Sequence, residues 1–465
     1  MSSKAAFSFV DLFAGIGGFH AALSAFGGEC VYAVEKDPDA AAVYERNWGI
    51  PALGDIVADT TGRMLVPRHD VLAAGFPCQP FSKSGFQRGM DETRGTLFWN
   101  ICRILEERRP TVVLLENVRN IAGPRHTHEW DVIIRSLRDL GYRVSSKPVV
   151  YSPHLLPPER GGRPQVPERV FIMGTYVGKA RAKGEVEPSV RHEPVGGWNP
   201  DDWDLDAHLP LQSDYELATR ASLELSPAEE TWVEAWNDFV VTLRKHGVAR
   251  LPGFPVWVDA FEAEILIADG TPDWKANFLR KNSEFYAQHM IVIDEWLDRW
   301  DGLRDFPASR RKFEWQAQSA DSLDETVMHL RPSGLRVKRA TYVPALVAIT
   351  QTSILGDRRR RLSPREVARL QGLPEWFDFG PQPDAASYKQ AGNGVNVGAA
   401  YHVLREHVLA NLAAIAKRRP LLAKAVSDSL ETPDPAVERL NGATAALLRT
   451  REGVSPTEES LTVAG

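Results

Sequence analysis

Cysteine, long apolar runs and excess positive charge are all scarce in this 465-residue sequence. Its three cysteines, Cys30, Cys78 and Cys102, match neither a disulfide framework nor the paired spacing of a zinc site. We therefore expect no metal and a reducing, cytoplasmic environment. No apolar stretch reaches the roughly 20 residues that a membrane helix needs. The first residues also lack the apolar core and the cleavage site of a secretion signal.

The formal net charge is −6, because 61 acidic residues outnumber 55 lysines and arginines. This balance excludes a uniformly basic nucleic-acid coat but allows a local basic face. The charge is unevenly distributed: residues 201–250 hold 11 acidic and 4 basic residues, whereas residues 331–371 hold 10 basic and 2 acidic ones. With 43% hydrophobic residues the composition is that of a folded protein, whose length indicates two to three domains or one large domain with an insertion.

The first 180 residues alternate between short apolar runs and amphipathic stretches. The apolar runs predict buried strands at residues 7–13, 30–37, 70–76, 111–118 and 169–177. Apolar residues at helical spacing predict helices at residues 19–27, 38–49, 96–110 and 128–142, and a further one at 281–300. Repeated β-α-β units predict an α/β fold in which helices cover both faces of a parallel sheet.

A glycine-rich turn, DLFAGIGG (Asp11 to Gly18), lies between the first strand and the first helix. Glycines there let the backbone turn tightly and approach a ligand, although many such turns are purely structural. Glu35 follows about 20 residues later, at the end of the second strand, where a carboxylate binds a ribose diol. Asp55, at the expected end of a third strand, suits an adenine amine. Together these residues predict a nucleoside site, and both a dinucleotide and S-adenosylmethionine fit the spacing.

The segment GFPCQPFSKSG (Gly75 to Gly85) follows a buried strand, at the edge where α/β proteins bind ligands. Pro77 restricts the backbone directly before Cys78. A lone cysteine is usually a buried structural residue, but the neighbours here are polar, namely Gln79, Ser82 and Ser84. Polar neighbours favour an accessible, nucleophilic thiol. The Gly- and Ser-rich stretch that follows has the composition of a mobile lid.

Glu116 and Asn117 end the strand that begins at Thr111. An acid in this place is often a helix cap. Because the strand that precedes Cys78 is expected beside it, general acid chemistry is the interpretation that we favour. A thiol nucleophile and an acid suit attack on an electrophilic heterocycle whose ring nitrogen the acid protonates.

These segments occur in one order: DLFAGIGG, the Glu35 strand end, GDI, GFPCQPFSKSG, ENV, RPQVPERVFIMG, RLSPREVARLQGLP and QAGNGVNVG. In this combination the sequence resembles the DNA (cytosine-5) methyltransferases, in particular the bacterial enzymes of restriction–modification systems. The resemblance covers most of residues 7–178 and 355–405. It implies a Rossmann-like S-adenosylmethionine-dependent methyltransferase fold with a smaller inserted target-recognition domain. The implied divisions are a catalytic part at 1–184, target recognition at 185–355, completion of the catalytic domain at 356–420 and a loose tail at 421–465.

The resemblance also implies a reaction, the methylation of C5 in a flipped-out cytosine of duplex DNA. Cys78 attacks C6 of the base and Glu116 engages N3. Arg169 approaches the cytosine, while Asn117 and Pro77 hold the Pro-Cys turn.

Further site residues are implied by the same resemblance. Phe13 is expected to stack on the adenine of S-adenosylmethionine, Glu35 to bind its ribose and Asp55 its amine. The other cofactor contacts implied are Gly15, Ile16, Gly18, Ile56, Leu97, Asn393 and Val395. DNA contacts are expected from Gln79, Ser82, Ser84, Gln165, Arg336, Arg339 and Arg360.

One motif departs from the family pattern. The family has Gln-x-Arg-x-Arg before the strand that reads VFIMG, whereas this chain has Gln165, Val166, Pro167, Glu168 and Arg169. A guanidinium is a rigid multidentate donor that proline does not replace. The hypotheses are a weakened activity, or compensation by a nearby arginine, for which Arg160 and Arg163 are the candidates.

The basic segment is the expected place for phosphate contacts, from Arg331, Arg336, Lys338, Arg339 and Arg358 to Arg361, although a charge run is often only a solvated surface. Four tryptophans are expected in the core rather than on bases: Trp274, Trp296, Trp300 and Trp315. Cys30 and Cys102 are also expected in the core.

The expected partners are double-stranded DNA and a cognate restriction endonuclease, and we expect a monomer, associated with the nucleoid and without membrane contact. Three alternatives stay open: the same chemistry on RNA, a variant sulfonium donor, and a weakly active or silent DNA-binding relative. An oxidoreductase explains neither Pro77-Cys78 nor Glu116.

Overall fold

The computed structural model describes residues 5–77, 96–217, 221–346 and 352–440. The chain divides into two compact units: unit 1 comprises Met1–Trp203, Ala345–Thr350 and Val367–Gly465, and unit 2 comprises Asp204–Pro344 and Gln351–Glu366. These boundaries fall later in the sequence than the predicted divisions at 185 and 355. No helix in the described ranges combines the length and the apolarity needed for a membrane span.

A mixed sheet forms the centre of unit 1, in the order β2-β1-β3-β4-β8, with β5 and β6 both paired to β8. Its strands are β1 Phe7–Leu12, β2 Gly28–Val34, β3 Val71–Gly75, β4 Val112–Val118, β5 Tyr142–Val144, β6 Val149–Tyr151 and β8 Arg169–Tyr176. Strands β1 to β4 are parallel, as predicted, but β8 runs antiparallel to β4. The prediction of a parallel β8 is wrong because no α-helix crosses over from β6 to β8 in residues 152–168, all of which the structure describes, so β8 does not complete a further β-α-β unit.

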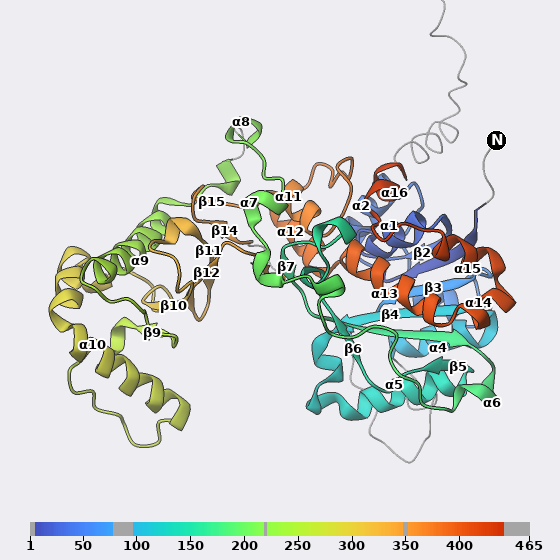
Figure 1. Cartoon of the computed structure of the whole chain (residues 1–465), viewed down its shortest axis with the longest axis horizontal. Coiled ribbons are helices and arrows are strands. Elements are labelled where there is room, and N and C mark those ends of the chain that lie inside the picture. The colour runs from blue at the N-terminus through green and yellow to red at the C-terminus, as the bar shows by residue number, and fades with distance from the viewer. Residues whose placement is uncertain (1–4, 78–95, 218–220, 347–351, 441–465) are drawn as a thin grey trace, which may run out of the picture. The chain divides into compact units, whose positions relative to one another are not determined.

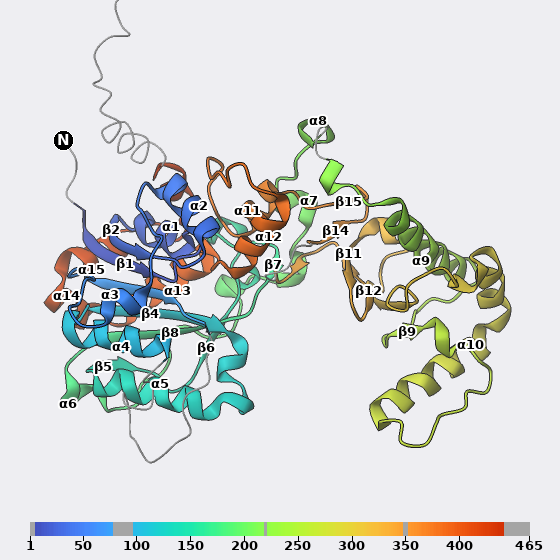
Figure 2. The same cartoon turned by 180° about the vertical axis from the view of Figure 1, so that it is seen from behind.

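Two layers of helices cover this sheet, as predicted (Figures 1 and 2). Alternation along β1 explains the layers, since Phe9 enters one core whereas Val10 and Leu12 enter the other. The first layer holds α1 Gly18–Ala25, α2 Pro38–Trp48, α13 Val397–Ala410, α14 Leu412–Arg418, α15 Pro420–Ser427 and α16 Asp434–Glu438. The second layer holds α3 Ile56–Thr60, α4 Leu97–Arg108 and α5 Thr127–Asp139.

Both ends of the chain therefore build one core in unit 1. Figure 1 shows the orange and red C-terminal helices beside the blue N-terminal strands and helix α1. Residues 421–440, which we predicted as a loose tail, instead contribute Leu422, Val426 and Val437 to the first core. Cys30 and Cys102 are both buried, as predicted.

Unit 2 packs helices against one face of a second sheet, whose strand order is β15-β14-β11-β12-β10-β9. The strands are β9 Val256–Trp257, β10 Lys312–Gln316, β11 Thr326–Arg331, β12 Gly334–Arg339, β14 Ile354–Leu355 and β15 Arg360–Arg361. The helices in this core are α9 Pro227–Lys245 and α10 Asp273–Arg299. Short elements elsewhere in the chain are β7 Gln165–Val166, β13 Val343–Pro344, α6 Lys179–Ala182, α7 Leu205–His208, α8 Asp214–Leu217, α11 Pro364–Leu370 and α12 Asp384–Asn393.

The tryptophans of unit 2 were expected in its core. Trp296 and Trp315 are buried there, and Trp300 is half-buried at the edge of the same core. Trp274 is 61% exposed, so the prediction is wrong for this residue. The reason is local, because the chain from Asp269 to Lys275 lies largely at the surface.

Candidate catalytic and cofactor site

An acid and a guanidinium meet at one edge of the unit 1 sheet. Glu116 of β4 lies opposite Gly75 of β3 on one side and Phe171 of β8 on the other. Its Oε1 is 3.3 Å from Nε of Arg169, at the start of β8. Arg169 also donates from Nη2 to the carbonyl of Gly392, at 3.1 Å. The antiparallel β8 thus brings Arg169 to the carboxylate and joins both to the C-terminal GNGV segment.

Burial sets the protonation of Glu116. The residue is 8% exposed. Desolvation raises the pKa of its carboxyl from 4.5 to about 7, and the positive charge of Arg169 opposes part of that rise. The side chain lies within β4 rather than at a helix start, so it is not the helix cap that we considered. A buried carboxyl of this kind can carry a proton near neutral pH, as general acid catalysis requires.

Asn117 holds the turn that leads to Cys78. Its Nδ2 donates to the carbonyl of Phe76 at 2.8 Å, and its Oδ1 accepts from the amide of Val118 at 2.8 Å. Phe76 is buried, whereas the next residue, Pro77, is exposed. The chain therefore leaves the sheet beside Glu116 at Pro77. The predicted nucleophile and DNA contacts that follow lie outside the described residues, namely Cys78, Gln79, Ser82 and Ser84.

The glycine-rich turn and Glu35 are joined by hydrogen bonds. Glu35 Oε2 accepts from the amide of Gly15 at 2.9 Å, and Oε1 accepts from the amides of Lys36 and Asp37, both at 2.8 Å. These bonds orient a half-buried carboxylate at the end of β2. Phe13 precedes the turn with a φ of 56°, in the left-handed region that non-glycine residues rarely adopt. Strain of this kind often marks a ligand site.

Asp55 differs from its predicted place. Its backbone does not end a strand but begins α3, where Oδ1 accepts from the amide of Val57 at 2.9 Å. In place of the expected third strand, the described residues directly before Asp55 form a single isolated β-bridge, between Leu53 and Glu35. The carboxylate is nevertheless half-exposed, 3.8 Å from Lys36 Nζ.

The C-terminal motif packs directly on the glycine-rich turn. A Cβ on Gly18 would lie only 2.2 Å from the carbonyl oxygen of Val395, so glycine is required for this approach. Val395 and Ile16 are buried, whereas Asn393 is exposed at the end of α12. The structure thus gathers most of the predicted cofactor residues. Ile56 is buried in the second core, and Leu97 packs against it half-buried, as Phe13 also does.

The comparisons with known proteins decide the family. The model of the C-5 cytosine-specific DNA methylases matches residues 7–408. This chain belongs to that family. The membership confirms the predicted family and fold class, a Rossmann-like methyltransferase with cytosine C5 of DNA as its target.

Two type II methyltransferases among the relatives agree with this methylase assignment. The type II methyltransferase M.AluI of Cellulosimicrobium cellulans is 49% identical over 87% of this chain and 92% of its own length. The type II methyltransferase M.HhaI of Haemophilus parahaemolyticus is 42% identical over 36% of this chain and 48% of its own length. Among solved structures, the Dnmt2 methyltransferase of S. pombe covers 87% of this chain and 99% of its own, with 16% identity and a TM-score of 0.45.

The close packing of Gly18 predicts an effect of substitution in this methylase. Gly18→Ala is expected to cost about 1–3 kcal/mol of unfolding free energy and to weaken cofactor binding, because Val395 must move away from the turn. Urea unfolding and equilibrium dialysis with S-adenosylmethionine measure the two effects. Gly184→Ala is the matched control, since a Cβ there meets no atom within 4 Å. Unchanged binding by Gly18→Ala would contradict the prediction.

Neither candidate for compensating the missing arginine lies free at the catalytic edge. Arg163 donates from Nη2 to both carboxylate oxygens of Asp434, at 3.0 Å each, and Arg160 pairs with Glu431 at 2.9 Å. Both therefore attach the C-terminal segment to unit 1. Pro167 itself is buried.

Two predicted DNA contacts are buried instead. Gln165 is 0% exposed and donates from Nε2 to the carbonyl of Leu370 within unit 1. Arg360 is 6% exposed and forms a two-pronged pair with Glu366, with Nη1 and Nη2 at 2.9 and 2.8 Å from its oxygens. Both side chains are therefore inaccessible and hydrogen-bonded within the protein, which does not favour a contact to DNA.

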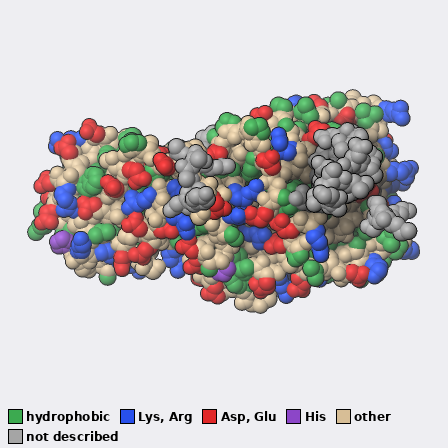
Figure 3. All heavy atoms as spheres, turned by 90° about the horizontal axis from the view of Figure 1, so that it is seen from above, with side chains coloured by type: hydrophobic (Ala, Val, Ile, Leu, Met, Phe, Trp, Pro, Cys, Tyr) green, Lys and Arg blue, Asp and Glu red, His purple; other side chains and the backbone are tan. Residues whose placement is uncertain are grey.

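The two charged blocks of the sequence neutralise each other in unit 2. From the basic block, Arg358 pairs with Asp206 at 3.3 Å and Arg361 with Glu229 at 2.6 Å, and both partners belong to the acidic block. Arg359 pairs with Asp324 at 2.6 Å. The predicted polarisation is therefore absent at this arginine run. Basic and acidic side chains are likewise interspersed on the face that Figure 3 shows.

Sequence reasoning missed a buried polar network beneath the glycine-rich turn. His20 Nδ1 lies 2.7 Å from the hydroxyl of Tyr44, which is 3.5 Å from Oδ2 of the fully buried Asp11. Burial lowers the pKa of His20 to about 3, so its imidazole is neutral, and burial raises the pKa of Asp11 well above its usual value. The signal was Asp11 itself, an acid inside an apolar strand.

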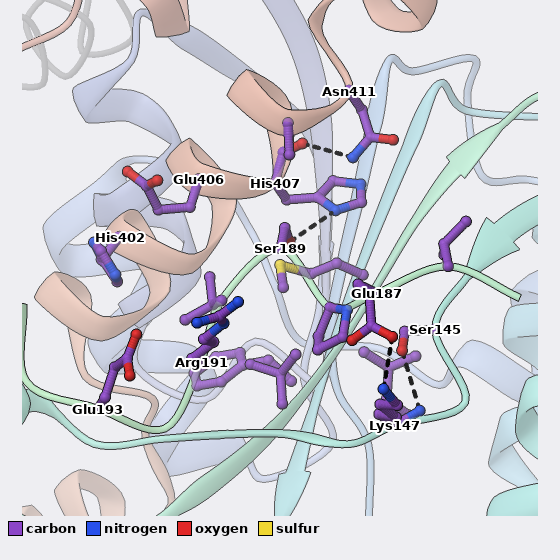
Figure 4. A pocket seen from close by; sticks show the side chains of 18 of the residues that line it. Ser145, Lys147, Glu187, Ser189, Arg191, Glu193, His402, Glu406, His407 and Asn411 are labelled. Atoms are coloured by element: carbon purple, nitrogen blue, oxygen red, sulfur yellow. Dashed lines mark hydrogen bonds and ion pairs between the residues drawn. The ribbon is translucent and has the colours of Figure 1, made fainter.

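A cavity of about 840 Å³ lies elsewhere in unit 1, between α13, β8 and the segment around residues 186–196 (Figure 4). None of the predicted catalytic or cofactor residues lines it. Some of its polar side chains pair with one another: Lys147 pairs with Glu187 at 2.6 Å, and His407 lies 3.4 Å from the hydroxyl of Ser189. The cavity therefore does not coincide with the candidate site at the sheet edge.

Proposed function

We propose that this methylase transfers a methyl group from S-adenosylmethionine to C5 of a cytosine in a specific duplex DNA sequence. The observation that carries the proposal is the environment of Glu116, buried 3.3 Å from Arg169 and beside the turn that Asn117 holds. An acid whose pKa is raised to about 7 suits protonation of a ring nitrogen near neutral pH. In the sequence Cys78 directly follows Pro77, the last described residue after β3, and Gly75 at the end of β3 lies opposite Glu116.

The proposed reaction has two covalent steps on the base. The Cys78 thiolate attacks C6, the C6–S bond forms, and the electron pair of the C5–C6 double bond moves toward C5 and N3 while Glu116 gives a proton to N3. C5 then bonds to the methyl carbon, whose bond to the sulfonium sulfur of the donor would break with S-adenosylhomocysteine as the leaving group, while N3 returns its proton to Glu116. Loss of the C5 proton to water restores the C5–C6 double bond, breaks the C6–S bond and regenerates the thiolate. Arg169 keeps Glu116 in place and is near enough to donate to the base. A base in a stacked duplex cannot reach these groups, so the cytosine must leave the helix.

The residues around the glycine-rich turn fit the proposed cofactor. S-adenosylmethionine supplies an electrophilic methyl group bound to a sulfonium. The carboxylate of Glu35, oriented by three amides, suits a ribose diol, and Phe13, which precedes the same glycine-rich turn, suits stacking on adenine. Asp55 suits the adenine amine. The Val395 segment, packed on Gly18, is placed to cover the methionine end.

Two specific observations bear on the alternatives. Pro167 is buried, and neither Arg160 nor Arg163 replaces the missing guanidinium, which supports a weaker activity than that of relatives with both arginines. The preserved pair of Glu116 and Arg169 argues against a silent relative. A variant sulfonium donor fits the same residues. The type II names of the relatives support a cognate restriction endonuclease as functional partner, and we further propose a monomeric methylase.

The decisive experiment is direct. The protein is incubated with duplex DNA and S-adenosylmethionine carrying a labelled methyl group, and the DNA is digested to nucleosides for mass analysis. We expect labelled 5-methylcytosine with the wild type and none with Cys78→Ala, because the C6 adduct cannot form. Cys102→Ala is the matched control, since that buried cysteine lies away from the sheet edge in α4.

Each outcome of this experiment distinguishes the proposal from one of its alternatives. Absence of any modified cytosine with the wild type would refute the methyltransferase proposal, and methylation surviving Cys78→Ala would refute the covalent mechanism. A mass other than that of a methyl group would identify a variant donor. Methylation of RNA in preference to duplex DNA would reassign the substrate.

A further inference from the structure

The sheet of unit 2 has two different faces. Its strands alternate, so that Phe313, Trp315, Leu335, Val337 and Met328 enter the core beneath α9 and α10. The residues between them belong to the opposite face, on which Val327 is buried and the other members are polar. We call this the polar face and define it by Glu314, Gln316, His329, Arg331, Arg336 and Lys338.

Strand register places these polar residues side by side. Arg336 of β12 lies opposite Glu314 of β10 on one side and opposite His329 of β11 on the other. Lys338 lies opposite Gln316 in the same way. The polar face thus spans three neighbouring strands. The positions of its side chains are fixed by the hydrogen-bonded register of these strands and not by loops.

Arg336 is oriented by an acid while its outer donors stay available. Its Nε donates to Oε2 of Glu314 at 2.6 Å, and its side chain is 31% exposed. Neither Nη group has an acceptor among the described residues. A guanidinium held through Nε presents its remaining donors in a fixed plane. Arginine donors of this kind pair with O6 and N7 of guanine in the major groove.

The rest of the polar face carries unneutralised positive charge. Arg331 and Lys338 have no acidic partner within the described ranges, so three cations share the single carboxylate of Glu314. Burial, together with Arg336 and Arg331, lowers the pKa of Lys338. Burial, together with the charges of Arg331, Lys338 and Arg336, lowers the pKa of His329 to about 4, so its imidazole is neutral. Its Nε2 lies 2.6 Å from the hydroxyl of Ser353. Mutual repulsion among cations is relieved when an anion binds.

A recess adjoins this face at the end of β12. A cavity of about 160 Å³ is lined by Gln316, Lys338, Arg339, Thr341 and Tyr342. Its lining combines two cations with hydroxyl and amide groups, which is the set of donors that contacts phosphate and sugar in protein–DNA complexes.

We propose that the polar face reads the duplex, with Arg336 recognising a guanine edge and Lys338 and Arg331 contacting phosphates. Glu314 is then a positioning residue, which acts on the base through Arg336. Strands of other DNA-binding proteins enter the major groove in this manner. The inference rests on the proposed function, because it names the residues by which the methylase selects its sequence.

The test separates recognition from chemistry. Cys78→Ala protein, which retains the polar face, is used to select binding sequences from a random pool of duplexes. We expect one enriched sequence that contains guanine. Adding Arg336→Ala, or Arg336→Lys, should relax the preference at a single base pair by about 5- to 150-fold and leave the other positions unchanged.

Further variants test the division of roles. Glu314→Ala should relax the same base pair as Arg336→Ala, and the double variant should be no worse, because both changes remove one contact. Lys338→Ala should weaken binding to all sequences alike and lower the salt slope of binding by about 1. Arg304→Ala, which removes a 78% exposed guanidinium from unit 2, is the matched control and should change nothing.

The outcomes are distinguishable from those for the reaction itself. An unchanged sequence preference in both Arg336 variants, with unfolding midpoints at the wild-type value, would overturn the proposal even if the wild type methylates DNA. If Arg336→Ala weakened binding equally for all sequences, without changing the preference at one base pair, recognition of a base by Arg336 would be overturned as well. Preferential binding of an RNA competitor over the duplex pool would also overturn it. If the wild type makes no methylcytosine but the positional effect is found, the proposed function fails and this inference stands.

Discussion

Glu116→Gln is expected to slow methyl transfer by about 10²- to 10⁴-fold while leaving cofactor binding unchanged. Glutamine keeps the volume of the side chain and a hydrogen bond to the base, but it has no proton to transfer to N3. Single-turnover rates on a duplex substrate measure the effect. Glu159→Gln is the matched control, because Glu159 is an exposed acid on a turn. A rate within threefold of the wild type (about 0.6 kcal/mol) would contradict the role of Glu116.

The pH dependence of the rate should change in the same variant. Burial raises the pKa of Glu116 to about 7, so the protonated form that donates to N3 decreases as pH rises through neutrality. The wild-type rate constant should therefore carry a falling component near pH 7, superimposed on the rise from thiolate formation at Cys78. Glu116→Gln should keep the rise and lose the fall. Identical profiles for the two proteins would exclude Glu116 as the acid.

Stability supplies an independent measure of the same carboxyl. Its pKa is about 7 when folded and 4.5 for the ordinary group, so the folded protein binds a proton more tightly. That contribution is present below pH 4.5 and is lost as pH rises through 7. Between pH 4 and pH 8 the wild type should lose about 3 kcal/mol of unfolding free energy relative to Glu116→Gln. Urea unfolding of unit 1 at both pH values measures this difference.

Arg360→Ala is expected to destabilise unit 2 by about 3–5 kcal/mol, because it leaves the carboxylate of Glu366 buried without its cation. Both side chains are almost inaccessible, at 8% and 0% exposure. Glu366 also accepts from the amides of Gln212 and Ser363, both at 2.8 Å, and so joins the segment around Gln212 to residues 360–366 of unit 2. Removing one member therefore disrupts the whole network.

The neighbouring arginine offers a matched control. Arg358→Ala removes a pair whose acid, Asp206, is 65% exposed, and surface pairs of this kind contribute at most about 1 kcal/mol. Denaturant unfolding of the two variants should separate them clearly. If Arg360→Ala instead unfolded like the wild type and lost affinity for DNA, the buried network would be of no consequence and the prediction from sequence would be restored.

Charge is the property for which composition was least informative. The acidic block at 201–250 and the basic block at 331–371 suggest a polarised protein. In unit 2 these blocks are partners, as Arg361 is with Glu229, because residues distant in the chain lie together in space. On the polar face, among the described residues, Arg331, Arg336 and Lys338 have only the carboxylate of Glu314 to offset their charge. The identification of this face depends on strand register and on the position of Glu314, neither of which a charge count contains.

Local sequence pattern and motif order alone determine most strands and helices of unit 1, the family and its target. Buried strands such as β3 and β4, helices such as α4 and α5, and the place of Glu116 at a strand end all follow from short apolar runs, because burial and hydrogen bonding act on adjacent residues. The family and its cytosine target follow from motif order. Tertiary structure alone decided the direction of β8, the contact of Arg169 with Gly392, the burial of Gln165 and Arg360, and the donors left available on Arg336. Those features depend on which distant segments meet, and a one-dimensional pattern does not record the packing and desolvation that such meetings impose.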